Sequence, residues 1–149
     1  MNGNEAAAAL AEVGRTEQRL AERARWPFHR HAMFGLIEGL VVAAVAQPLD
    51  VAGGMVVAAL ALLTVCITDD RRRHGMFVSG CQPGATLPLT VAIFLFVILM
   101  LVASLAVRDG EAAQPFGYLF GAIAFAVCTA ASMKWEKIYR AQLGHEGQQ

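Results

Sequence analysis

The chain has 149 residues, a mean hydropathy of +0.49, only 16% charged side chains and a formal net charge of zero. Four long apolar runs and their connections use nearly all of it, which leaves no room for a separate soluble catalytic domain. Each run is long enough to cross about 30 Å of hydrocarbon as a helix. The runs are 28–46, 51–68, 86–107 and 116–133. We therefore expect an all-α fold: a four-helix transmembrane bundle of two antiparallel hairpins over 28–144.

The N-terminal segment, 1–27, is rich in Ala, Glu and Arg and lacks the apolar stretch of a signal peptide, so we expect the first span to act as an uncleaved insertion signal. Apolar residues at three- and four-residue steps predict an amphipathic cytoplasmic helix that ends near Pro27. Three roles are open to this helix: lying on the membrane through its arginines, pairing with a second copy, or staying in solvent.

Basic residues are distributed very unevenly among the connections. Eleven of the twelve Lys and Arg residues precede or open the first span or follow the second and fourth, and only Arg108 lies in the other two connections. By the positive-inside rule, both termini and the middle loop are cytoplasmic. We predict a multi-pass protein of the bacterial cytoplasmic (inner) membrane, with a disordered tail over 145–149.

Glu38 is the only charged side chain deep inside any of the four runs. Burying a carboxylate at that depth in the membrane costs free energy, so an acid there is a candidate functional residue. It shares a helix face with His31 and Gly35, next to Gly39, and we expect it to point toward a packing surface. Two interpretations stay open: a proton- or cation-linked transport site, or a protonated acid that hydrogen-bonds across helices for packing.

Small residues at four-residue spacing recur in three of the spans, where they let helix backbones approach closely in lipid. The predicted packing positions are Gly35, Gly39, Gly54, Gly117 and Gly121. The third span has no small residue over 93–101, so we expect it to be the most lipid-exposed helix.

The middle loop opens with two aspartates and three arginines. The candidate contacts for a phosphate or lipid headgroup are Arg71, Arg72 and Arg73. The alternative is a charged stop at the membrane surface. The histidines show no metal-binding spacing, and the three cysteines suit packing better than a disulfide or zinc site, so we predict no metal and no cofactor.

The loop Arg71-Arg-Arg-His-Gly-Met-Phe-Val-Ser-Gly-Cys-Gln-Pro-Gly84, preceded by a polar helix ending in Arg-Trp-Pro-Phe-His, resembles a group of small uncharacterised bacterial four-span membrane proteins. This resemblance implies a topology and no activity. The architecture is also similar to that of small multidrug exporters, which carry a membrane-embedded glutamate in their first span. The surroundings of Glu38, Gly-Leu-Ile-Glu-Gly, differ from those of that family, so the similarity implies only an analogy for Glu38.

Three functions follow from these patterns. The leading one is an oligomeric proton- or cation-linked transporter or channel subunit that uses Glu38. The second is a membrane-embedded enzyme acting on a lipid or isoprenoid, with Glu38 as a buried acid and Asp69 and Asp70 near the headgroup. The third is a non-catalytic membrane scaffold or assembly partner. The expected partners are the lipid bilayer and a second copy or another membrane protein, not nucleic acid.

Overall fold

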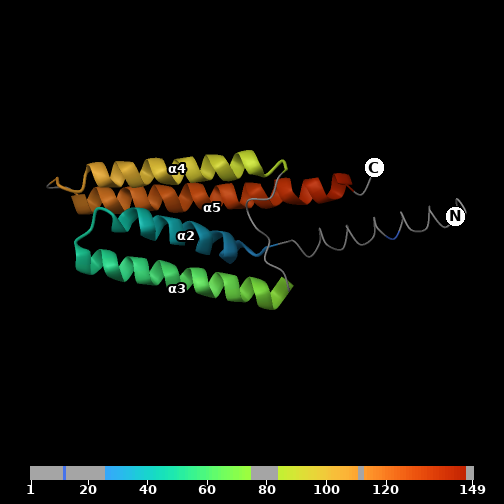
Figure 1. The fold of residues 1–149 in the computed structure, drawn as a ribbon, viewed down its shortest axis with the longest axis horizontal. Helices are drawn as coiled ribbons and strands as arrows, with labels where there is room; N and C mark the ends of the chain where they lie inside the picture. Colours follow the sequence, from blue (N-terminus) through green and yellow to red (C-terminus); the bar gives the residue numbers. More distant parts are fainter. Residues whose placement is uncertain (1–11, 13–25, 75–83, 111–112, 147–149) are drawn as a thin grey trace, which may run out of the picture.

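The structure is a computed structural model that describes residues 12, 26–74, 84–110 and 113–146. Within these residues it contains helices and no strand, which confirms the predicted all-α class. The four helices are α2 (Phe28–Ala44), α3 (Leu49–His74), α4 (Leu87–Ala106) and α5 (Ala113–Glu146) (Figure 1). Apart from helical Glu12, the predicted N-terminal helix lies outside the described residues before Trp26.

Three of the helices are long and apolar enough to cross a membrane, judged by length and composition. They are Leu49–Arg72 within α3, Leu87–Ala106, and Ala113–Gln142 within α5. Helix α2 has 17 residues, and it begins Phe-His-Arg-His. It is therefore about 26 Å long by the α-helical rise per residue, and its apolar part is shorter still.

Local sequence explains the helix boundaries. Pro27 precedes α2 in an extended conformation, as expected for a residue that cannot donate a backbone hydrogen bond. Helix α3 begins at Leu49, so Asp50 lies in its first turn, where its negative charge favours the helix N-terminus. At its other end α3 continues past Thr68 through the charged run, because Asp and Arg in this run are compatible with a helix.

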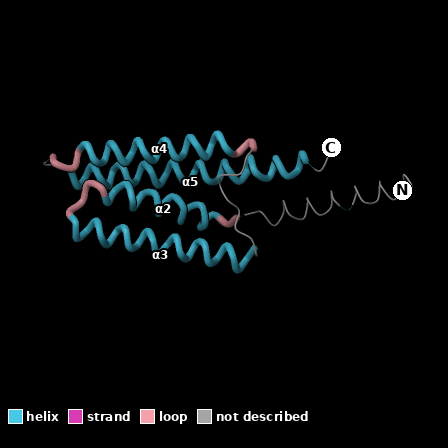
Figure 2. The backbone as a smooth tube through the Cα atoms, in the orientation of Figure 1, coloured by secondary structure: helices cyan, strands magenta, loops and turns pink. Residues whose placement is uncertain are grey.

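The helices lie side by side in the order α4, α5, α2, α3 (Figures 1 and 2). The α2–α5 contact is the most extensive, α3 packs chiefly on the other side of α2, and α4 lies against α5 and touches α2. Both predicted hairpins are present, but α3 lies at the edge of a row and not within a closed bundle. Helices α3 and α4 are equally exposed: 6% of the most apolar window of each is buried, against 28% for α5. The third span is thus not uniquely exposed.

Helices α2 and α5 approach each other closely at facing glycines. A Cβ atom added to Gly39 would lie 2.8 Å from the carbonyl oxygen of Gly121, and one added to Gly121 would lie 2.7 Å from that of Gly39. Real Cβ atoms do not approach a carbonyl oxygen that closely, so only glycine fits both positions. The two backbones therefore contact each other directly, as small residues allow in membrane helices.

The same contact extends one turn in each direction along the antiparallel pair. A Cβ atom at Gly117 would lie 2.7 Å from Cβ of Ala46, and one at Gly35 would collide with Oγ1 of Thr129 and the carbonyl oxygen of Phe125. Four of the five glycines predicted to pack thus lie between α2 and α5.

Gly54 is the fifth, and it does not pack within the chain. It is exposed on α3, and a Cβ atom added there would meet nothing within 4 Å. Within the described chain Gly54 therefore lies at no helix contact, because α3 turns a different face toward α2.

Candidate functional site

The α2–α5 contact contains a buried histidine that is hydrogen-bonded through both ring nitrogens. His31 is 3% exposed. Its Nδ1 lies 2.9 Å from Oγ of Ser132, and its Nε2 lies 2.9 Å from Oε2 of Glu136. Ser132 and Glu136 are one turn apart on α5, so both present their side chains to the same residue of α2.

Either protonation state of His31 satisfies this geometry. In the neutral ring, Nε2–H donates to the Glu136 carboxylate while Nδ1 accepts from the Ser132 hydroxyl; in the imidazolium both nitrogens donate. The hydroxyl can donate or accept, so it adapts to either state. His31 can therefore gain and lose a proton without leaving an unpaired group.

Glu136 connects His31 to the end of the bundle at which α2 begins, which we call the charged end. Glu136 is 8% exposed, and Nη1 of Arg140 lies 3.8 Å from its Oε1, one turn further along α5. Nε of Arg140 is buried and has no hydrogen-bond partner among the described residues. The carboxylate thus lies between a buried imidazole and a half-exposed guanidinium.

Thr129 continues this polar face of α5 toward the middle of the helices. It is 8% exposed, and among the described residues its Oγ1 has no hydrogen-bond partner. It faces Gly35, where the lack of a side chain leaves the hydroxyl directed at the α2 backbone. We call Glu136, His31, Ser132 and Thr129 the polar row.

Glu38 lies on α2 one turn beyond Gly35, next to the inner end of the polar row. It is half-buried, and within the described part of the chain no hydrogen bond or ion pair reaches its carboxylate. Its neighbour Gly39 is enclosed by α5, so Glu38 lies at the margin of the α2–α5 contact. The structure thus places Glu38 near the polar row, but no hydrogen bond among the described residues connects it to that row.

An aromatic cluster covers the polar row at the charged end. Trp26 stacks on Trp135 and Tyr139 with ring centroids 5.6 and 6.4 Å apart, and Trp135 stacks on Tyr139 at 5.1 Å. Trp135 is 8% exposed, and its Nε1–H donates to Oγ1 of Thr90 at 3.1 Å. It packs between helices because α4 supplies that acceptor.

Asp69 and Asp70, which we expected at the start of the middle loop, lie in the last part of α3 and make different contacts. Asp70 is 7% exposed and accepts two hydrogen bonds from Arg30, from Nε at 2.7 Å and from Nη2 at 2.6 Å. The guanidinium also lies 3.9 Å from the ring centroid of Trp26. This bidentate pair attaches the charged part of α3 to α2, while Asp69 lines a pocket beside it.

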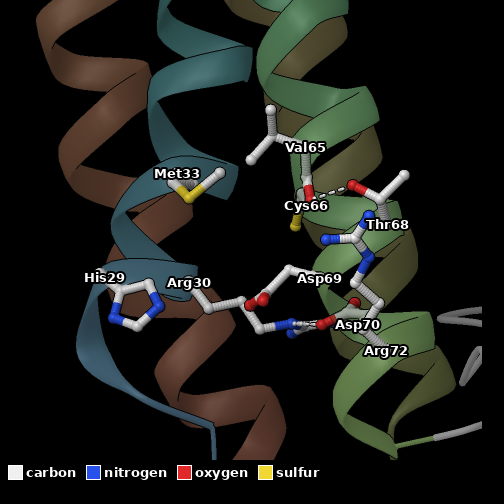
Figure 3. Close-up of a pocket in the computed structure, with 9 residues that line it drawn as sticks. All are labelled: His29, Arg30, Met33, Val65, Cys66, Thr68, Asp69, Asp70 and Arg72. Carbon is white, nitrogen blue, oxygen red and sulfur yellow. Dashed lines mark hydrogen bonds and ion pairs between the residues drawn. The ribbon is translucent and has the colours of Figure 1, made fainter.

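The three arginines proposed to contact a headgroup also differ in their surroundings. Arg71 and Arg72 are exposed, and only Arg72 lines the pocket between α2 and α3; the side chain of Arg73 is outside the described structure. His29 lines the same pocket, in which Figure 3 shows it across from Arg72.

Three members of the polar row, Thr129, Ser132 and Glu136, are missing from the sequence-based candidates. Glu136 lies in a Lys-Trp-Glu-Lys stretch that is typical of a helix leaving the membrane, which hid its burial. The available signal was the spacing of Thr129, Ser132 and Glu136, which places three polar groups on one face of a helix. Among the described residues no group of His, Cys, Asp and Glu is arranged to hold a metal ion.

Comparisons of the chain with protein families, with curated proteins and with solved structures find no match.

Proposed function

We propose that this protein is a proton-linked transporter or channel subunit of the bacterial inner membrane, in which Glu38 accepts protons that enter along the polar row. In this proposal α2 is a fourth span, both termini and residues 75–83 are cytoplasmic, and the charged end faces the cytoplasm. The uneven distribution of Lys and Arg supports this orientation. The direct backbone contact of α2 with α5 supports its place in the membrane, because α5 is long and apolar enough to span.

The polar row is the observation that carries the proposal. Chains of acidic and histidine side chains inside membrane helices mark proton relays. Glu136 takes a proton from cytoplasmic water and passes it to Nε2 of His31 in the tautomer that carries its proton on Nδ1. Nδ1–H then gives its proton to the Ser132 hydroxyl, which releases its own proton inward. Histidine suits this task because each of its two ring nitrogens can carry or release a proton.

Thr129 supplies the next step toward Glu38. A buried hydroxyl without a protein partner favours an ordered water, since water commonly satisfies such groups. Oγ1 of Thr129 lies where a side chain at Gly35 would begin, and Gly35 is one turn from Glu38 on α2. We assign the link between Thr129 and Glu38 to water, which both donates and accepts hydrogen bonds.

The remaining half of the pathway lies between subunits in this proposal. Four helices in a row enclose little space (Figure 1), and Glu38 is only half-buried within the described chain. A second copy placed against this side would complete an enclosed route and would shield Glu38 from lipid. The proposal therefore includes a homo-oligomer.

Proton flux into liposomes tests this function. The purified protein is reconstituted with a pH-sensitive dye inside, and uptake is driven by a potassium diffusion potential. Wild type should acidify the vesicles, and Glu38→Gln should fall to the rate of empty vesicles. Asp50→Asn is the matched control, since Asp50 is exposed at the end of α3 that lies opposite the charged end. This variant should keep the wild-type rate of proton flux.

Two outcomes would contradict the proposal. One is equal flux in wild type and Glu38→Gln, and the other is a wild-type flux no greater than that of empty vesicles. The second outcome would favour the scaffold role.

A further inference from the structure

The hydrogen bonds of His31 have the connectivity of a catalytic triad. Glu136, His31 and Ser132 follow one another as acid, imidazole and hydroxyl, with 2.9 Å at each of the two steps. In serine hydrolases this order orients a histidine that removes the serine proton, and it is recognised by geometry and not by position in the chain. Here Nδ1 faces the serine and Nε2 the acid, the reverse of the chymotrypsin arrangement, but either ring nitrogen can accept a proton from a hydroxyl.

The Ser132 hydroxyl is directed at His31 and not at its own helix. Serine and threonine inside a helix can donate to the carbonyl oxygen one turn earlier, as Thr64 and Thr68 do on α3 at 2.9 Å. Within the described part of the chain Ser132 makes no such bond, and its hydroxyl contacts only Nδ1 of His31. When Nε2–H is held by Glu136, the hydroxyl is the donor to Nδ1, which is the arrangement that activates a serine.

The three side chains differ in exposure as a nucleophilic site requires. His31 and Glu136 are 3% and 8% exposed, whereas Ser132 is partly exposed. Part of the Ser132 surface is thus open to a ligand, while the imidazole and the carboxylate are shielded from bulk water. Shielding strengthens the hydrogen bond that orients the imidazole and stabilises it when it becomes charged.

The position of Ser132 along α5 indicates the class of substrate. The apolar run of this helix ends at Met133, and Lys134 and Lys137, which are both exposed, follow it. In a membrane, such a boundary lies between the hydrocarbon and the headgroups, where the ester carbonyls of glycerolipids are located. A carboxylic ester of a membrane lipid therefore brings a carbonyl group to the depth of Ser132.

We propose that Ser132 is a nucleophile that accepts an acyl group from a lipid ester, with His31 as the general base and Glu136 as the group that positions it. Oγ forms a bond to the ester carbonyl carbon as Nδ1 takes the hydroxyl proton. The tetrahedral intermediate then expels the lipid alkoxide, which leaves with that proton. Water attacks the acyl-serine with His31 again as the base, and a fatty acid is released. This inference rests on the membrane location in the proposed function and not on proton transport by Glu38.

The tetrahedral intermediate also needs a hydrogen-bond donor for its oxyanion. Thr129 lies one turn before Ser132 on α5, and its Oγ1 has no hydrogen-bond partner among the described residues. Its hydroxyl proton is therefore available to a substrate. In this proposal the oxyanion takes the place of the water that we assign to Thr129.

Reaction with an alkyl fluorophosphonate measures the activation of Ser132. The phosphorus atom bonds to Oγ and fluoride leaves, so an activated serine gains a stable label that peptide mass spectrometry locates. The full-length wild type in detergent micelles should be labelled at Ser132. His31→Gln keeps a hydrogen-bonding side chain but removes the base, and it should slow labelling about a hundredfold. Ser104→Ala is the matched control for Ser132→Ala, since Ser104 is fully buried and donates to a backbone carbonyl oxygen.

Fatty acid release tests the lipid ester as the substrate. Each protein is incubated with phosphatidylglycerol in mixed micelles, and free fatty acid is quantified by mass spectrometry. Wild type and Ser104→Ala should release fatty acid at equal rates, and Ser132→Ala should fall to the rate without protein. Thr129→Val should lower the rate about a hundredfold, as expected for the loss of an oxyanion donor. Circular dichroism should show unchanged helix content in every variant.

Three outcomes would overturn the proposal. Absence of a label at Ser132 in wild type, or equal labelling rates in wild type and His31→Gln, would show that the hydroxyl is not activated and only packs or relays protons. Labelling of Ser132 without release of fatty acid would overturn the lipid ester as the substrate. None of these outcomes depends on the proton flux of Glu38→Gln, so the two proposals fail separately.

Discussion

Helix α2 makes two contacts of opposite character. Toward α5 it presents glycines and a doubly hydrogen-bonded histidine, and the two backbones touch. Toward α3 it leaves an open pocket and is held at the charged end by one ion pair. Helices in lipid gain little from burying apolar side chains, so close packing and hydrogen bonds determine which contacts are strong. The comparison indicates that, among the described helices, α2 packs more closely against α5 than against α3.

The largest expected effect comes from filling the glycine contact. Gly39→Leu places a side chain against the carbonyl oxygen of Gly121, and overpacking of this kind costs about 1–3 kcal/mol. Gly54→Leu makes the same chemical change in open space and should leave stability unchanged. Reversible unfolding in mixed detergent micelles measures both. Equal destabilisation by the two variants would show that α3 packs as tightly as α2 does against α5.

The contacts of His31 with Glu136 and of Arg30 with Asp70 give the second prediction. His31→Ala removes the partner of a buried carboxylate and should cost about 2 kcal/mol. Asp70→Ala should cost about 1 kcal/mol or less, because the Arg30 side chain is 22% exposed and can turn to water. The same unfolding assay compares them, and a larger loss in Asp70→Ala would reverse the order of the two contacts.

The smallest effect concerns a single hydroxyl between helices. Oγ of Ser104, which is fully buried, donates to the carbonyl oxygen of Val42 at 2.8 Å and joins α4 to α2. Ser104→Ala should cost about 0.6 kcal/mol, the average for interhelical hydrogen bonds in membranes. Thr64→Ala is its control, since that hydroxyl is exposed and donates only to Leu60 of its own helix. A loss of the same size in Thr64→Ala would remove the assignment to the interhelical bond.

The contacts of α2 with α5 and with α3 also show which features could be predicted from the sequence. Apolar runs and glycine spacing predicted the helices and the packing of Gly35 and Gly39, because both patterns are local. Spacing alone also predicted packing at Gly54, but it does not determine which face of α3 meets a neighbour. The pairing of His31 with Glu136 joins residues 105 positions apart. It depends on which helices become neighbours, and no local pattern specifies that.

Proton access to Glu38 is the central claim, and the exchange rate of its carboxyl proton tests it most directly. Infrared difference spectra between wild type and Glu38→Gln isolate the Glu38 carbonyl band at a pH where the acid carries its proton, and transfer to D₂O shifts the band as the proton exchanges. Thr129→Val is the decisive variant, since its hydroxyl has no described partner to lose and stability should be unaffected. We predict that exchange at Glu38 is markedly slower in Thr129→Val than in wild type. Equal rates in the two proteins would contradict the assignment of the polar row as the route to Glu38.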